Sequence, residues 1–466
     1  MIAGLTPYPE YKESGLPWAT KLPSHWKTER AKWLFTKMDR PVRPEDETVT
    51  CFRDGMVTLR KNRRLRGFTE AIFEFGYQGI RKGDLVIHAM DAFAGAVGVS
   101  DSNGKGTPVY LVCQPKDGIK AHYYAFIVRE MARSQWILAL AKGIRERSTD
   151  FRYEAFGGQR VPLLPPHEQD AIVRFLDHAN GRIERTIRAK KKLIALLNEQ
   201  KQAIIHRAVT LGLDPNVSLK PSGIPWLGDI PQHWEVWPLM RCAIERADYR
   251  GATPTKVEAG IFLVTAKNVR KGWIDYESSR EYVRASEYSK IMRRGLPRKG
   301  DVLLTMEAPL GHVALVDRED IALAQRLVRF RLDSDLVLSS FALLVLNSAY
   351  FQNQLLERAT GSTAQGIKAS KLPQLRVVLP NIDEQREIVS HIEIENGPRN
   401  TAIERTEREI ELLREYRTRL VADVVTGKLD VRDFARDLPD DTDELASSLS
   451  YGCEEEGELI EEEQLA

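Results

Sequence analysis

The sequence predicts an α/β protein of the α+β type, in which a pair of long antiparallel coiled-coil helices separates two globular domains as a pseudo-twofold tandem repeat. Three observations predict this fold class: a tryptophan-rich motif that occurs twice, a second pair of matching blocks, and an apolar stripe with helical spacing in both blocks. The 466 residues suffice for two domains of ordinary size, each with its own core.

The tryptophan-rich motif opens each half of the chain. Residues 14–26 contain SGLPW and LPSHW, and residues 222–234, which lie 208 positions later, contain SGIPW and IPQHW at the same spacing. A second pair of blocks, 168–214 and 384–430, aligns without a gap at an offset of 216. Since the halves diverge between these blocks, we expect the shared residues to form the scaffold and the divergent residues to set specificity.

Each half then has the pattern of a globular α/β domain. Short β-like runs such as 84–88 and 301–305 are separated by Gly, Pro and Asn, and a Lys-Gly-Asp sequence precedes both runs at similar positions. A proline-rich segment ends each domain just before a helix begins. We therefore expect globular domains at residues 1–165 and 213–381.

A long segment of mixed polar and apolar residues follows each domain, at 166–212 and 382–428. Its apolar residues recur mostly at intervals of 3, 4 or 7, which is typical of a helix that packs against a partner helix. From about Glu168 to Val209 such a helix would extend roughly 60 Å at about 1.5 Å per residue, too far to be stable alone in a small domain. We therefore expect each helix to pair with its repeat, the alternative being a generic coiled coil or core helix. The predicted packing positions are Ile172, Leu176, Ile187, Ile194, Leu197, Ile388, Ile392, Ile403, Ile410 and Leu413.

Glycine and proline interrupt both helical segments. Gly181 lies in the first and Gly397-Pro398 in the second. Because proline lacks a backbone donor and glycine favours the unfolded chain, we expect a kink or break at these points.

Charge is distributed unevenly along the chain. The sequence has 68 Lys or Arg and 66 Asp or Glu, but residues 437–466 hold twelve of the acidic residues and no basic one. The remainder therefore carries a basic excess that suits a polyanionic partner. We expect residues 436–466 to form a disordered, solubilising tail, with a DNA-mimicking regulatory tail as the alternative.

Cysteine positions and hydropathy indicate the cellular compartment of the protein. The four cysteines lie far apart and include no Cys-x-x-Cys pair, so neither a zinc site nor a disulfide framework is predicted. No apolar run approaches the ~18 residues of a membrane span, and no secretory leader is recognisable. We expect a cytoplasmic protein with no membrane partner.

Four stretches of the sequence, 86–110, 211–236, 361–389 and 425–432, resemble the specificity subunits of type I restriction–modification systems. The resemblance covers nearly everything from residue 8 to residue 435. It implies that the two domains are target recognition domains, each reading one half of a split DNA site, with the long helices as spacers. The partners it implies are double-stranded DNA, two methyltransferase (modification) subunits and restriction subunits with translocase and nuclease activity. S-adenosylmethionine, ATP and magnesium would then belong to those partner subunits.

Candidate DNA contacts are basic or amide-bearing residues within the two domains. Lys and Arg bind phosphates, Arg, Asn and Gln read base edges in the major groove, and a glycine-rich loop can approach a backbone closely. The alternatives are a solvated charged face and a structural turn. The candidates are Arg60, Lys61, Asn62, Arg63 and Arg64 in the first domain, and Lys267, Asn268, Arg270, Lys271, Ser362, Thr363, Gln365 and Lys368 in the second.

The sequence lacks the enzyme signatures that would accompany catalysis. It contains no Gly-x-x-x-x-Gly-Lys-Ser/Thr phosphate loop and no Asn-Pro-Pro-aromatic tetrapeptide, the signature of adenine methyltransferases. His167-Glu168 begins like a zinc-protease helix, but residue 171 is Ala, so the second ligand is missing. We predict no catalytic residue, metal or cofactor in this chain. A stand-alone DNA-binding or regulatory protein, a nuclease with an unrecognised site, and a pure scaffold are the alternative functions.

Overall fold

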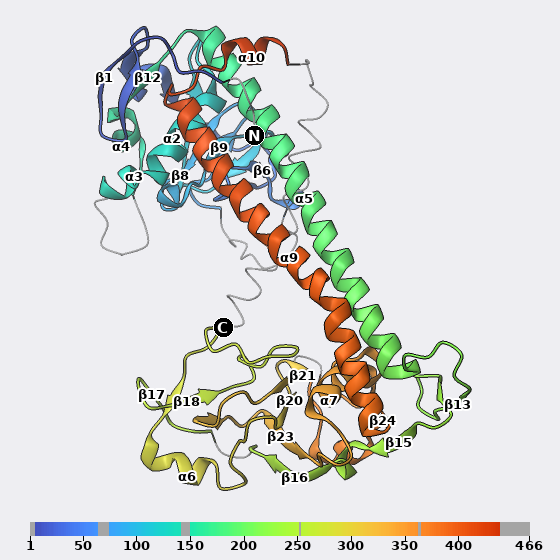
Figure 1. The fold of residues 1–466 in the computed structure, drawn as a ribbon. Helices are drawn as coiled ribbons and strands as arrows, with labels where there is room; N and C mark the ends of the chain where they lie inside the picture. Colours follow the sequence, from blue (N-terminus) through green and yellow to red (C-terminus); the bar gives the residue numbers. More distant parts are fainter. Residues whose placement is uncertain (1–4, 64–73, 141–149, 251–252, 362–364, 439–466) are drawn as a thin grey trace. The chain divides into compact units, whose positions relative to one another are not determined.

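The computed structural model describes residues 5–63, 74–140, 150–250, 253–361 and 365–438 (Figure 1). The chain divides into two compact units. Unit 1 comprises residues 1–190 and 408–466, and unit 2 comprises residues 191–407. Two long helices, α5 (Pro166–Leu211) and α9 (Ile382–Val425), each contribute one part to unit 1 and the other part to unit 2.

Unit 1 is built on a four-stranded antiparallel sheet with the order β4 (Phe35–Lys37), β11 (Tyr110–Pro115), β8 (Leu85–His88), β9 (Val97–Val99). Successive side chains of a strand point to opposite faces, so Leu85 and Ile87 enter the core shared with α2 (Ala121–Arg133), whereas Val86 enters a second core. That second core contains residues of β5 (Val49–Cys51), β6 (Val57–Leu59) and β7 (Gln78–Ile80); β7 pairs with β10 (Gly104–Gly106).

Unit 2 repeats this arrangement with the order β16 (Ala243–Asp248), β23 (Leu327–Leu332), β20 (Val302–Met306), β21 (Leu310–Leu315), again antiparallel. Helices α7 (Ser339–Leu346) and α8 (Ala349–Glu357) share the core on one face. The core on the other face includes residues of a mixed sheet with the order β17 (Lys256–Val257), β19 (Tyr282–Val283), β18 (Ile261–Val264), β22 (Ile321–Leu323). The predicted α/β class is thus confirmed.

The shorter elements complete both units. The tryptophan-rich motifs lie in two hairpins, formed by β1 (Tyr11–Leu16) with β2 (Ala19–Pro23) and by β13 (Leu219–Pro221) with β14 (Asp229–Pro231). The start of each domain pairs with its end, through β3 (Lys27–Arg30) with β12 (Arg160–Leu163) and through β15 (Glu235–Pro238) with β24 (Arg376–Leu379). The short helices are α1 (Ala31–Leu34), α3 (Trp136–Ala139), α4 (Tyr153–Gly158), α6 (Tyr288–Ile291), α10 (Arg432–Arg436), η1 (Arg60–Asn62), η2 (Ala92–Ala94), η3 (Leu239–Arg241), η4 (Ala285–Glu287) and η5 (Ala369–Gln374).

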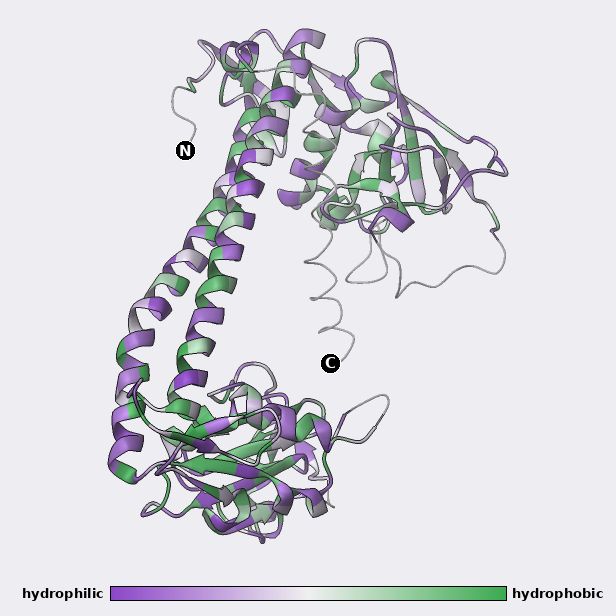
Figure 2. Ribbon diagram, turned by 90° about the vertical axis from the view of Figure 1, so that its right-hand side faces the viewer, coloured by the Kyte–Doolittle hydropathy of each residue, from purple (hydrophilic) through white to green (hydrophobic). Residues whose placement is uncertain are grey.

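Helices α5 and α9 contact each other in both units. In unit 1, Glu184 pairs with Arg417 at 3.2 Å and Lys190 with Glu409 at 2.5 Å, so the two helices run antiparallel there. In unit 2, residues 208 and 209 of α5 share a core with residues 388 and 392 of α9. Apolar and polar positions alternate along both helices (Figure 2). Of the predicted packing residues, Ile172, Leu176, Ile187, Ile388, Ile392, Ile403 and Ile410 are buried, and Ile194, Leu197 and Leu413 are half-buried.

The expected interruptions do not break the long helices. Both α5 and α9 are continuous through Gly181 and through Gly397-Pro398. None of the helices in the described part of the chain is long and apolar enough to cross a membrane.

The duplicated sequence motifs form two corresponding clamps at the start of the long helices. In unit 1, Trp26 Nε1 donates to Glu168 Oε2 at 2.6 Å and His25 Nε2 lies 2.8 Å from Glu168 Oε1. In unit 2, Trp234 and His233 make the same contacts with Glu384, at 3.0 and 2.8 Å. Each clamp ties the first residues of a domain to the helix that follows it.

The glutamine after each clamp glutamate fastens a second segment. Gln169 donates to the carbonyl of Leu164 at 2.9 Å, and Gln385 donates to the carbonyl of Pro380 at the same distance. Each amide oxygen also accepts from a backbone N–H about 50 residues earlier, Lys120 in unit 1 and Leu338 in unit 2. The shared residues are therefore scaffold, and His167-Glu168 belongs to a helix start.

Candidate nucleic-acid interface

In unit 2, residues from both stretches of predicted DNA contacts lie around the turn that joins β20 to β21, together with an exposed tryptophan. His312 Nδ1, just after the turn, donates to the carbonyl of Val269 at 2.8 Å, and Gly272 N donates to the carbonyl of Val313 at 2.8 Å. On the other side, Glu307 forms a β-bridge with Gly366. The loops at 267–273 and 360–368 thus border one turn.

The loop at 267–273 presents cations to solvent. Lys267 and Lys271 are exposed, and Arg270 is partly exposed with its Nε 3.4 Å from Asp275 Oδ2. Trp273 is also exposed, in a tight turn in which Arg270 N donates to its carbonyl at 2.9 Å. An exposed aromatic next to lysines can stack on a base or sugar while the lysines bind phosphate, and sequence reasoning missed this residue.

Asn268 corrects the sequence prediction. Its side chain is fully buried: Oδ1 accepts from Thr265 N and Oγ1, and Nδ2 donates to the carbonyls of Asp275 and Ser279, all within 3.0 Å. Every hydrogen-bonding group of the amide is therefore satisfied inside the turn. Asn268 shapes the loop that carries Lys267 and Lys271 and does not face a DNA base.

The glycine-rich loop is closed at its base. Thr360 and Gly366 exchange backbone hydrogen bonds of 2.8 and 3.0 Å, and Gln365 and Lys368 are exposed beside them. Ser362 and Thr363 lie outside the described residues.

In unit 1, the predicted basic run begins where the β5–β6 hairpin ends. Lys61 is exposed and pairs with Glu47 at 2.5 Å. Arg60 Nε donates to Thr50 Oγ1 at 3.3 Å, and Asn62 Nδ2 donates to Thr58 Oγ1 at 2.9 Å, so both side chains lie along the hairpin. Arg64 lies outside the described residues.

Arg63 is a second correction. Its side chain is only 4% exposed, its guanidinium lies 4.3 Å from the centre of the Phe52 ring, and it pairs with Asp54 at 2.6 Å. Removing this cation from its aromatic and acidic partners to reach a phosphate would cost both contacts. Arg63 therefore braces the hairpin turn, whereas Lys61 remains a candidate phosphate contact.

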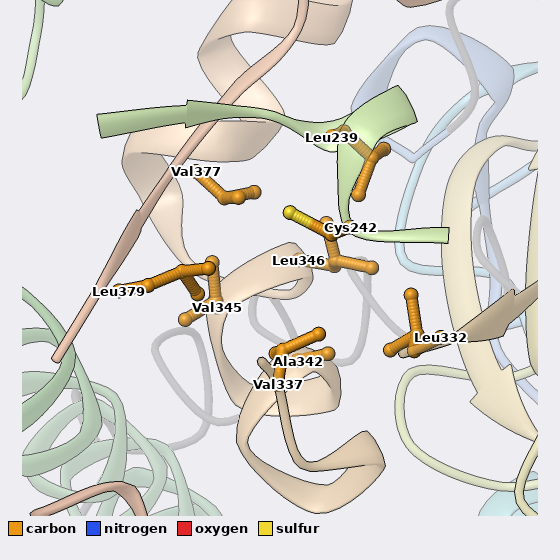
Figure 3. Close-up of a pocket in the computed structure, with 9 residues that line it drawn as sticks. All are labelled: Leu239, Cys242, Leu332, Val337, Ala342, Val345, Leu346, Val377 and Leu379. Carbon is orange, nitrogen blue, oxygen red and sulfur yellow. The ribbon is translucent and has the colours of Figure 1, made fainter. Parts of the chain in front are cut away.

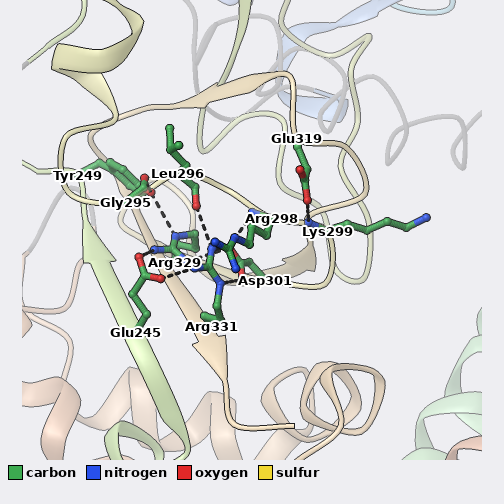
Figure 4. A network of polar contacts seen from close by, with 10 residues as sticks. All are labelled: Glu245, Tyr249, Gly295, Leu296, Arg298, Lys299, Asp301, Glu319, Arg329 and Arg331. Atoms are coloured by element: carbon green, nitrogen blue, oxygen red, sulfur yellow. Dashed lines mark hydrogen bonds and ion pairs between the residues drawn. The ribbon is translucent and has the colours of Figure 1, made fainter.

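A buried charged network supports another basic loop of unit 2 (Figure 4). The buried Asp301 accepts from Arg329 Nη1 at 2.8 Å and from Arg331 Nη2 at 2.9 Å, and its carboxylate also accepts from the backbone N–H of Arg298. Tyr249 Oη donates to the carbonyl of Gly295 at 2.7 Å. These contacts fix the loop at residues 293–300, which carries Arg293, Arg294, Arg298 and Lys299.

The corresponding aspartate of unit 1 has a different partner. Asp84 accepts from Arg81 N at 2.7 Å, as Asp301 does from Arg298, but its cation is Arg40, from the segment after β4. The Lys-Gly-Asp turn is thus common to both units, while the cation that neutralises it comes from different positions.

The chain is similar in sequence to known specificity subunits. Residues 281–412 match the model of the type I restriction modification DNA specificity domain. The MjaVIII type I restriction enzyme specificity subunit of Methanocaldococcus jannaschii is 25% identical over 290 residues, covering 60% of this chain and 64% of that protein. The EcoBI specificity subunit of Escherichia coli is 24% identical over 249 residues, half of each chain. Both relatives are thus specificity subunits of type I restriction enzymes, to which this chain is similar in sequence.

The fold of this chain is similar to that of a solved structure. A chain from a study of complex assembly and conformational transition of the type I R-M system superposes with a TM-score of 0.61 at 15% identity, covering 88% of this chain and 99% of that one. The matched part of the chain spans 64% and 50% of the lengths of the two curated relatives.

The described residues form neither a metal site nor a small-ligand cavity of useful size in the core of unit 2. Among the described residues there is no group of three His, Cys, Asp or Glu side chains that could hold a metal ion. A cavity in unit 2, lined by apolar residues including Cys242, Leu332 and Leu346, has a volume of only about 10 Å³ (Figure 3). Since a single water needs about 10–15 Å³, this is a packing gap and not a ligand site. Burial raises the pKa of the Cys242 thiol to about 11, so it is an unreactive core residue.

Proposed function

We propose that this chain is the non-catalytic, sequence-specific DNA-binding subunit of a type I restriction–modification complex. It reads a split DNA site, with one target recognition domain (residues 1–165 and 213–381) on each half-site, so that partner subunits methylate host adenines and cleave unmodified DNA. The observation that carries this proposal is that two units with the same strand order present different side chains around the corresponding turn, β8–β9 in unit 1 and β20–β21 in unit 2.

The proposed division of labour follows from the repeat. The shared clamps and Lys-Gly-Asp turns hold the same frame in both units, so two half-sites would meet similar surfaces with different readers. Lys61, Lys267, Lys271, Gln365 and Lys368 supply exposed cations or an amide for phosphates and base edges. We propose that α5 and α9 act as a coiled-coil spacer within a pseudo-twofold repeat, which sets the separation of the half-sites along the DNA.

The long helices also offer a surface for partner subunits. In unit 1, a groove of about 630 Å³ between α5 and α9 is lined by Ile183, Leu412 and Tyr416 among others, and the Leu412 side chain is largely exposed. Exposed apolar residues at a groove are typical of a protein contact. We propose that two methyltransferase subunits dock on the helices and that restriction subunits join them. S-adenosylmethionine, ATP and magnesium would reside in those cytoplasmic partners.

Mapping methylated adenines across the genome, with and without this gene, tests the proposal. Loss of methylation at one split motif is the expected result, and exchange of one domain for that of a relative should change one half of the motif only. Unchanged methylation would contradict the proposal. Specific DNA binding without co-purification of a methyltransferase would instead favour a stand-alone DNA-binding protein.

A further inference from the structure

Each unit holds an exposed arginine against a carboxylate in the turn that joins a central strand of its sheet to the neighbouring edge strand, β8 to β9 in unit 1 and β20 to β21 in unit 2. In unit 1, Arg53 Nη2 lies 3.2 Å from Asp91 Oδ1, in the β8–β9 turn. In unit 2, Arg326 Nε lies 3.1 Å from Glu307 Oε1, in the β20–β21 turn. The two arginine side chains are 65% and 48% exposed. Both pairs join segments that are distant in sequence, which distinguishes them from surface pairs between near neighbours.

Corresponding backbone hydrogen bonds fix the two turns. In unit 1, Ala89 N donates to the carbonyl of Val109 and Phe151 N donates to the carbonyl of Ala89, both at 3.1 Å. In unit 2, Met306 N donates to the carbonyl of Arg326 at 2.9 Å and Ile367 N to the carbonyl of Met306 at 3.0 Å. Three segments of chain therefore meet at each turn, and in unit 2 one of these segments carries Arg326.

Glycine closes both turns in the same backbone conformation. Gly95 has φ +89° and Gly311 has φ +85°, in the left-handed region that glycine adopts without strain. The two turns are therefore corresponding features of the two units, although eight residues separate β8 from β9 and three separate β20 from β21.

The two pairs differ in the guanidinium nitrogen that faces the carboxylate, but both arginines remain accessible to solvent. In unit 2, Nε of Arg326 faces Glu307, and the arginine side chain is 48% exposed. In unit 1, Nη2 of Arg53 donates to Asp91, and the arginine side chain is 65% exposed. A planar arginine fork donates two hydrogen bonds to O6 and N7 of guanine, the commonest specific contact in the major groove. A carboxylate that already orients the fork lowers the entropy lost on binding.

The two arginines come from different elements of the fold. Arg53 lies in the turn between β5 and β6, whereas Arg326 directly precedes β23. The unit 1 residue whose carbonyl takes the place of the Arg326 carbonyl is Val109, which has no charge. Two half-sites of different sequence require base-contacting side chains at different positions on one shared scaffold.

We propose that Arg53 and Arg326 are base-reading residues, each binding the major-groove edge of one guanine in its own half-site, and that Asp91 and Glu307 are positioning residues. This inference rests on the proposed DNA-binding function and names the residues that carry its specificity.

The experiment uses the full chain assembled with its methyltransferase subunits and a duplex containing the mapped split site. We expect Arg326→Gln to lower the preference for one G·C pair about 5- to 150-fold, because a bidentate contact contributes about 1–3 kcal/mol of discrimination. The other half-site and the salt dependence should be unchanged. Arg53→Gln should do the same in the opposite half-site. Glu307→Gln should reduce the same preference by a smaller factor.

Matched controls are available in both units. Arg318→Gln removes an exposed arginine paired with Asp320, and Lys120→Gln removes an exposed lysine paired with Asp170. Both should leave base preference unchanged, and all variants should keep the wild-type melting temperature because the altered side chains are exposed.

Two results would overturn the inference while the proposed function stands. A loss of affinity that is uniform over all sequences, with a shallower salt slope, would make the arginines phosphate contacts. Unaltered preference at every base pair would leave them as surface ion pairs. If the wild-type complex itself bound no particular sequence, the proposed function would fail, and the inference with it.

Discussion

Trp26 donates its indole hydrogen to Glu168 at 2.6 Å, although 142 residues separate the two in sequence. Arg432, from the segment after α9, also reaches this carboxylate at 3.0 Å. In unit 2, Glu384 accepts from Trp234 without a corresponding arginine among the described contacts, and its side chain is 21% exposed compared with 2% for Glu168. The two clamps therefore have the same design but different burial, which gives a matched pair for measurement.

Glu168→Ala should destabilise the protein more than Glu384→Ala. The first change leaves a buried indole N–H, His25 and Arg432 without their common acceptor, a loss of about 3–5 kcal/mol for a buried charged partner. The second leaves groups that water can reach, so we expect about 1–2 kcal/mol. Denaturant unfolding of both variants measures the difference, and equal losses would contradict the burial argument.

Asp177 gives the stability of unit 1 an unusual pH dependence. Burial raises the pKa of this α5 carboxyl to about 7. The folded protein thus keeps a proton that the unfolded chain releases near pH 4, so the contribution of Asp177 falls as the pH rises from about 4 to 7 and stays low above that. Asp177→Asn should raise the free energy of unfolding at pH 8, by up to about 4 kcal/mol, and change little at pH 4.

The control for Asp177 is an exposed carboxylate on the same helix. Asp170 pairs with Lys120 at 2.8 Å, and both side chains are about half exposed. Asp170→Asn should therefore have a small effect at either pH. An Asp177→Asn effect of the same size at pH 4 and pH 8 would exclude the proton-linked explanation.

Substitutions in the loop at 267–273 should separate effects on DNA binding from effects on stability. Lys267→Gln and Lys271→Gln should each weaken DNA binding on all sequences and reduce the salt slope by about one, with stability unchanged. Asn268→Ala should instead lower the free energy of unfolding by about 2–3 kcal/mol, since it leaves buried turn groups unsatisfied. Salt titrations of binding together with melting curves distinguish the two effects. A reduced salt slope in a fully stable Asn268→Ala variant would restore it as a DNA contact.

The sequence was informative where the two halves repeat each other. The motifs around Trp26 and Trp234 recur with the Glu-Gln pair of each helix, so internal comparison identified them as scaffold, and the structure joins them in two clamps. The approximate first and last residues of the long helices could also be predicted from the local sequence, because a proline-rich segment precedes each helix and an apolar stripe runs along it.

Side-chain partners across the fold could not be predicted. Arg63 stands in a basic run, and only the tertiary position of Asp54 and Phe52 reveals that it is buried. Arg53 and Arg326 lie outside any basic run, and their significance depends on turns that are 38 and 19 residues away in sequence. The aspartates of the two Lys-Gly-Asp turns likewise take arginines from different strands or loops. Such pairings have no periodic signature, because they depend on which loops the sheet brings together.

The groove between α5 and α9 in unit 1 yields a prediction about partner binding. Leu412 is 56% exposed at this groove, and burying such a side chain in an interface contributes about 1.5–3 kcal/mol. Leu412→Asp removes that contribution and adds a charge, so co-purification of the methyltransferase subunit should fall at least tenfold. DNA-independent pull-down from cells expressing both chains measures this. Leu356→Asp, at a similarly exposed leucine of α8, is the control and should retain the partner. Equal retention by both variants would place the methyltransferase contact elsewhere on the helices.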